Sequence, residues 1–109
     1  SAYESHLDVS PEATANRIVN GSTAFFDAFR TQNMELDTET SVTEFLKVIS
    51  SGIDKGFEEA KDILESLSVL TGEIESNIGL TYDFVQQGLA DFKAQLQASL
   101  TENKAATES

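Results

Sequence analysis

Carboxylates are the most abundant side chains in this sequence that could do chemistry. Four of them stand at intervals of four, four and three residues, which places them on one side of a helix: Asp54, Glu58, Asp62 and Glu65. A di-iron bundle would need Glu-x-x-His pairs on facing helices, and a calcium loop would need alternating oxygen ligands around a central glycine. The sequence contains neither pattern. We therefore interpret the row as a solvated helix face, with lysines nearby for pairing, and expect no metal and no cofactor.

Nucleophilic catalysis finds little support in the residue types. His6 is the only histidine, and it lies in a segment without helical periodicity. A serine or threonine nucleophile normally needs a base held against it. The chain has no cysteine, which excludes disulfides, thiolate metal sites and cysteine nucleophiles. We expect a protein that is not an enzyme. A cation-binding or hydrolytic bundle stays open as a third hypothesis, because sequence cannot show two carboxylates facing each other across a cleft.

Charge narrows the classes of partner. The 109 residues include 7 basic and 19 acidic side chains, for a formal net charge of −12. Such a field repels phosphate backbones and anionic lipid headgroups, so neither nucleic acid nor a membrane surface is expected, whereas a basic protein is tolerated. No apolar run approaches the roughly 20 residues that span a bilayer, which favours a soluble protein of undetermined compartment. Ser1 and Ala2 resemble a processing or cloning remnant, as expected for a domain excised from a longer protein.

Three helical segments organise the chain. Ser10-Pro11-Glu12 is a strong helix start, and apolar residues then repeat at helical spacing to about residue 33. The second helix is predicted to begin at the capping box Ser41-Val-Thr-Glu44 and to end at Thr71-Gly72. A third apolar stripe predicts a helix from about Glu73 to Ser99.

The predicted fold class is all-α. Short connections between long helices favour an up-down-up bundle of three helices, with a fourth if the second helix breaks near Gly52. The predicted organisation is an extended arm over residues 1–9, one bundle domain over 10–99 and a disordered tail over 100–109, where alanine, threonine, glutamate and serine show no periodicity.

Small residues form a second pattern. Gly52, Gly56 and Ala60 stand four apart in the second helix, and glycine in a helix interior costs roughly 1 kcal/mol relative to alanine. A neighbouring helix that touches bare backbone would explain them. Gly21 and Ala24 form a comparable edge on the first helix. The two edges are predicted to pack closely against each other, or one of them receives a helix of a partner.

One apolar pair does not fit a minimal bundle. Leu80 and Phe84 stand four apart and point about 120–155° away from the buried stripe of the third helix. They are a candidate interaction patch, because exposed apolar patches usually mark binding surfaces. Either the arm that carries Tyr3 and Leu7 folds back over the pair, or another protein covers it.

Four segments together resemble a known family: Val9-Ser-Pro-Glu-Ala-Thr-Ala-Asn-Arg-Ile-Val19, Phe25-Phe26-Asp-Ala-Phe29, Gly52-Ile-Asp-Lys-Gly-Phe-Glu-Glu-Ala-Lys-Asp-Ile-Leu64 and Thr81-Tyr-Asp-Phe-Val-Gln-Gln-Gly-Leu89. They are similar to a bacterial domain-of-unknown-function family, number 5610, over about Val9 to Leu96. The resemblance implies a helical module within longer bacterial proteins, some of them loosely labelled as a hydrogenase accessory component. The cysteines and paired histidines that would hold a metal centre are absent, so the resemblance carries over no functional residue.

These observations favour a non-catalytic protein-interaction or structural module of a larger bacterial protein, which binds a protein partner or other domains of its own chain. The alternative is an acidic regulatory domain that binds a basic partner. Salt distinguishes the two hypotheses, because screening weakens contacts between charges but not contacts between apolar surfaces. The sequence does not indicate the oligomeric state.

Overall fold

The structure is a computed structural model that describes residues 10–108 of the chain, with side chains over 10–99. It consists of α2 (Pro11–Thr23), α3 (Phe26–Gln32), α4 (Thr38–Ser66) and α5 (Gly72–Glu108), and no strand occurs between residues 10 and 108. The all-α prediction is confirmed, and so are three helical stretches, the first of which is divided into α2 and α3. The arm over residues 1–9, with Tyr3 and Leu7, lies outside the described residues.

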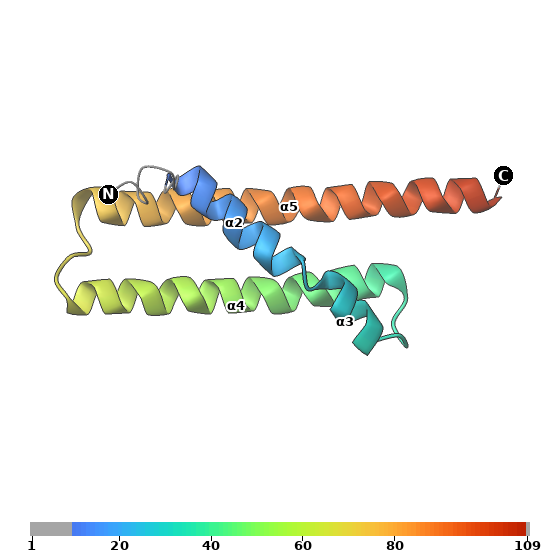
Figure 1. The fold of residues 1–109 in the computed structure, drawn as a ribbon, viewed down its shortest axis with the longest axis horizontal. Helices are drawn as coiled ribbons and strands as arrows, with labels where there is room; N and C mark the ends of the chain where they lie inside the picture. Colours follow the sequence, from blue (N-terminus) through green and yellow to red (C-terminus); the bar gives the residue numbers. More distant parts are fainter. Residues whose placement is uncertain (1–9, 109) are drawn as a thin grey trace, which may run out of the picture.

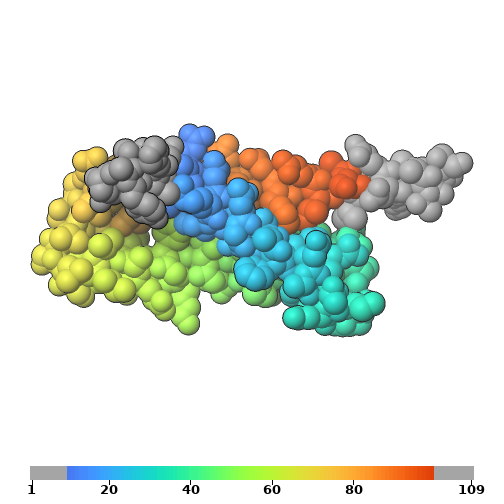
Figure 2. All heavy atoms as spheres, viewed as in Figure 1, coloured from blue at the N-terminus to red at the C-terminus, as the bar shows by residue number. Residues whose placement is uncertain are grey.

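The helices form an elongated body rather than a regular bundle. α4 and α5 run antiparallel as a long hairpin, and α2 crosses this hairpin obliquely and packs mainly on α5 (Figure 1). α3 lies over the beginning of α4, at the end opposite to the α4–α5 connection (Figure 2). The radius of gyration is 17.4 Å, compared with about 13 Å for a compact domain of this length. The arrangement departs from three parallel rods because α2 is short and inclined.

The first helical stretch bends between Thr23 and Phe26, where the sequence predicted one helix over 11–33. The Thr23 hydroxyl donates to the carbonyl of Val19 over 2.7 Å, a local bond that disturbs the last turn of a helix. The bend turns Phe26 into the body, where its ring lies 5.2 Å from that of Phe45 in an edge-to-face contact. Burial of this ring stabilises the bent form over a straight helix.

Both ends of α4 differ from the prediction. The helix begins at Thr38, and the carboxylate of Asp37 accepts a hydrogen bond of 2.7 Å from the backbone N–H of Thr40. Ser41, the predicted cap, is 1% exposed inside the helix. An aspartate at this place satisfies a free amide, as a serine would, and its negative charge also complements the positive end of the helix. This hydrogen bonding lowers the pKa of Asp37 below its usual value.

α4 runs without a break through Gly52 and ends at Ser66. Ser68 has a φ of 60°. Its backbone N–H donates to the carbonyl of Glu65, and the backbone N–H of Val69 donates to the carbonyl of Leu64. This is a Schellman motif with serine at the position that usually holds glycine. Gly72, the predicted end of this helix, instead opens α5 with a φ of 55°.

α5 is longer than predicted, because it continues beyond Ser99 to Glu108. The segment predicted as a disordered tail over 100–109 is thus helical over 100–108. Each added residue of an existing helix gains a backbone hydrogen bond without a new nucleation cost, and alanine, glutamate and lysine are good helix formers.

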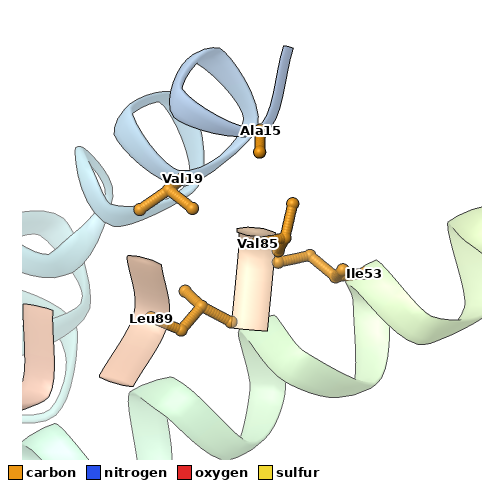
Figure 3. Close-up of a cluster of buried hydrophobic side chains, with 5 residues drawn as sticks. All are labelled: Ala15, Val19, Ile53, Val85 and Leu89. Atoms are coloured by element: carbon orange, nitrogen blue, oxygen red, sulfur yellow. The ribbon is translucent and has the colours of Figure 1, made fainter. Parts of the chain in front are cut away.

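Two apolar clusters form the core. The first joins α2, α4 and α5 through five buried residues shown in Figure 3: Ala15, Val19, Ile53, Val85 and Leu89. The second joins α3 to α4 through Phe26, Val42 and Phe45, with Phe92 of α5 at its edge. Leu46 and Ile49 pack against both clusters, so the two regions are continuous along α4.

A close contact between two helices lies at Gly88, a glycine that the sequence analysis missed. A Cβ atom added to Gly88 of α5 would stand 2.8 Å from Cγ2 of Val19 on α2. The bare backbone of Gly88 therefore lets α2 approach α5 closely.

The predicted close packing of the small residues is wrong for the described part of the chain. Cβ atoms added to Gly21, Gly52 and Gly56 would meet nothing within 4 Å, and Ala24 and Ala60 are exposed. Gly56 and Ala60 lie where the short helix α2 leaves the apolar face of α4 uncovered, and no side chain or neighbouring helix approaches Gly21 or Gly52 within 4 Å of an added Cβ.

Among the described helices, none combines the length and the apolar character needed to cross a lipid bilayer.

Candidate functional site: apolar surface near the α4–α5 connection

An apolar groove of about 450 Å³ opens between α2, α4 and α5. Nine residues line it: Thr14, Ile18, Ile53, Gly56, Phe57, Ala60, Leu64, Ile78 and Thr81. The lining contains no charged side chain, and the hydroxyl of Thr81 donates to the carbonyl of Asn77 in its own helix over 2.7 Å. The groove can therefore hold apolar groups but offers no chemistry of its own.

Helical periodicity explains the composition of the groove. Ile53, Phe57, Ala60 and Leu64 follow one another at intervals of four, three and four on α4 and form one face. α2 begins only at Pro11, over α5, and crosses obliquely toward α3, away from the α4–α5 connection, so this face stays partly uncovered at its C-terminal half (Figure 1). The groove exists because a 13-residue helix covers a much longer hairpin incompletely.

A second apolar surface adjoins the groove at the end of the hairpin. Four large side chains are exposed there, and we call them the hairpin-end surface: Ile63 (61% exposed), Leu67 (66%), Val69 (39%) and Ile74 (44%). They come from the last turns of α4, the connection and the first turn of α5. Exposed single apolar residues are ordinary, but four within twelve residues of sequence form a concentration that usually has a role in binding.

The predicted patch of Leu80 and Phe84 is only partly realised. Leu80 is 47% exposed, whereas Phe84 packs against the first core cluster beside Val85 and Leu89. Neither residue lines the groove. Phe84 therefore contributes to the core, and the exposed apolar surface shifts toward the hairpin end. Sequence alone does not reveal that surface, because Leu67 and Ile74 continue the helical spacing of apolar residues that is typical of buried stripes.

A polar cleft of about 550 Å³ lies between α4 and α5 and includes acidic residues from both helices. The Tyr82 hydroxyl donates to Oδ1 of Asp54 over 2.7 Å, and the ring of Tyr82 meets that of Phe57 edge-on at 5.3 Å. This hydrogen bond, with the negative charges of Asp54 and Asp83, raises the pKa of Tyr82 above its usual value. The contact joins residues 28 apart in sequence, so no local pattern could have predicted it.

The four carboxylates of the predicted row divide between two environments. Asp54 and Glu58 line the polar cleft together with Lys61, Glu75 and Asp83, while Asp62 and Glu65 do not line it. Within residues 10–99, no group of three or more histidine, cysteine, aspartate or glutamate side chains is placed to hold a metal ion. His6 lies outside the described residues.

Of the comparisons with known proteins, only the one with sequence models of protein families gives a match. No curated protein and no solved structure matches it. The family model described as "Domain of unknown function (DUF5610)" matches residues 1–92, so it also covers the arm that the sequence resemblance left out. Since this match spans most of the 109 residues, the chain belongs to the DUF5610 family.

Proposed function

We propose that this chain is a non-catalytic protein-interaction module of a larger bacterial protein, and that the hairpin-end surface is where it binds its partner. The single observation that supports the proposal most is the exposure of Ile63 and Leu67, each more than 60% accessible. Complete burial of a side chain of this size contributes about 1.5–3 kcal/mol to the free energy of binding, so a few such contacts give useful affinity.

The partner is a protein segment with apolar side chains and basic flanks. Exposed acidic residues are close in sequence to the hairpin-end surface on both helices, namely Asp62, Glu65, Glu73 and Glu75. A basic flank would complement them and would accelerate association with a chain whose net charge is −12. Nucleic acid and anionic membranes stay disfavoured for the same electrostatic reason.

The second candidate function is an acidic regulatory domain that binds a basic partner through the polar cleft. Four carboxylates line the cleft with one lysine, which supports this alternative: Asp54, Glu58, Glu75 and Asp83. Binding through the cleft weakens strongly as salt is added, whereas binding through the hairpin-end surface weakens less, because salt screens its basic flanks but not its apolar contacts. An enzymatic function is the third and least supported hypothesis.

Photo-crosslinking tests the main proposal in cells that make the parent protein. A photoreactive amino acid at Leu67 is expected to give one discrete adduct, which mass spectrometry then identifies. The matched control is Val48, which is 59% exposed but lies in the first half of α4, away from the hairpin end. Adducts at Val48 but not at Leu67 would contradict the proposal.

A paired variant checks that the adduct depends on the apolar surface. The exchange of both Ile63 and Leu67 for serine removes exposed side chains only, so the helical circular dichroism and the melting temperature are expected to stay close to those of the parent. The adduct is then measured with the photoreactive group at Ile74. Loss of the adduct in a folded variant supports the proposal, and an unchanged adduct refutes it.

A further inference from the structure

We propose that residues 1–9 of this chain pack into the apolar groove between α2, α4 and α5 and complete its core. The position of α2 is the first reason. Ser10 caps α2, and two residues of its first turns, Thr14 and Ile18, form one wall of the groove. α2 therefore begins at the edge of the groove, and the part of the α4–α5 hairpin next to its connection lies beyond the first residue of α2 (Figure 1).

Length and residue types of the segment match the groove. Nine extended residues span at most about 30 Å, and the wall from Ile53 to Leu64 extends along α4 by about 17 Å. The segment carries Tyr3, Leu7 and Val9, while Glu4 and Asp8 can stay in water. Apolar side chains gain free energy in a groove without charged walls.

The family match supports an occupant from the chain itself. It begins at residue 1 and so includes the nine residues in the same sequence pattern as α2, α4 and most of α5. A segment attached at Ser10 also reaches the groove without the loss of translational and rotational freedom that a separate molecule undergoes. A second copy of this chain would undergo that loss and would bring its own strong negative charge.

This inference differs from the earlier expectation that the arm covers Leu80 and Phe84, because neither residue lines the groove. It also stands independently of the function proposed above, which concerns Ile63 and Leu67 outside the groove lining.

Tryptophan fluorescence of the full 109-residue chain tests the inference. The chain contains no tryptophan, so Tyr3→Trp introduces a single reporter. If the segment fills the groove, the emission maximum shifts to shorter wavelength than that of a solvated indole, and acrylamide quenches the emission weakly. Ala60→Asp in the same background places a charge in the groove at an exposed alanine, and we expect the emission to return to that of a solvated indole.

Val48→Asp is the matched control, since Val48 is an exposed α4 residue outside the groove, and it is expected to leave the blue-shifted emission unchanged. Circular dichroism verifies that each variant stays helical. A solvated emission in the Tyr3→Trp chain, or a shifted emission that ignores Ala60→Asp, overturns the inference. Emission that shifts with protein concentration assigns the groove to a second copy and overturns it as well. The crosslinking at Leu67 reports separately on the proposed function.

Discussion

Glycine has opposite roles at two positions of this chain. At Gly88 the missing side chain leaves room for Val19, whose Cγ2 atom stands 2.8 Å from where a Cβ would be. At Gly56 an added Cβ would meet nothing within 4 Å. Replacement of glycine by alanine is therefore expected to change the free energy of unfolding in opposite directions at the two positions. Packing determines the effect at Gly88, and helix propensity determines it at Gly56.

Gly88→Ala is expected to lower the free energy of unfolding by roughly 1–3 kcal/mol, since the new methyl group forces Val19 or α2 to move. Gly56→Ala, the matched control, is expected to raise it by roughly 1 kcal/mol. Urea denaturation followed by circular dichroism measures both. Equal stabilisation by the two variants would show that α2 does not approach α5 closely at Gly88.

Tyr82 makes stability depend on pH. Its hydrogen bond to Asp54 raises its pKa in the folded chain, so the contribution of this contact is complete below the pKa of tyrosine in the unfolded chain, about 10, and is lost as the pH rises through the higher folded value. Wild type is thus expected to exceed Tyr82→Phe in stability near neutral pH and to lose that advantage in alkali. Urea titrations of both chains between about pH 8 and pH 11 measure the difference. A constant difference across this range would contradict the assigned contact.

At the scale of the elements, a single substitution at the end of α4 is expected to raise the stability of the folded chain. Ser68 adopts a left-handed conformation with a φ of 60°, which costs a residue with a side chain roughly 1–2 kcal/mol. Ser68→Gly removes this cost but adds freedom to the unfolded chain, so we expect a net stabilisation of roughly 0.5–1 kcal/mol. Thermal melting measures the gain.

Ser51→Gly is the control for that prediction, because Ser51 is exposed in the interior of α4, where glycine lowers stability by roughly 0.5 kcal/mol. If Ser68→Gly destabilises as Ser51→Gly does, the connection does not adopt the Schellman geometry.

The helical elements could be predicted from the sequence because their apolar spacing is regular over many turns. Their ends could not: Asp37 and Ser41 are both good caps, and only the burial of Ser41 decides between them. The bend before Phe26 depends on its contact with Phe45, 19 residues later, which no local pattern contains.

The candidate site was predicted less well than the fold. Its α4 wall follows from the helical spacing of Ile53 and Phe57, but the spacing does not indicate whether a neighbouring helix covers that face. The groove exists because α2 is short and inclined, which is a property of packing between segments far apart in sequence. For the same reason the close contact at Gly88 could not be predicted from the sequence, since its partner Val19 lies 69 residues earlier.

At the scale of the whole molecule, the aromatic cluster and the apolar groove lie toward different ends. The aromatic cluster around Phe45 holds α3 to the beginning of α4, whereas the groove and the hairpin-end surface lie toward the α4–α5 connection. One end of the elongated body thus holds the aromatic cluster, with Phe25 and Met34 exposed beside it, and the other end carries the groove and the hairpin-end surface.

Leu46 and Ile49 have a consequence for how the molecule unfolds. Because both pack against each cluster, loss of either cluster exposes side chains that the other one needs, which couples the two halves into a single cooperative unit. The methyl resonances of Val85 and Val42, one in each cluster, are expected to disappear with the same urea midpoint. Replacing both Leu46 and Ile49 by alanine should separate the two midpoints, so that the ends of the body melt one after the other.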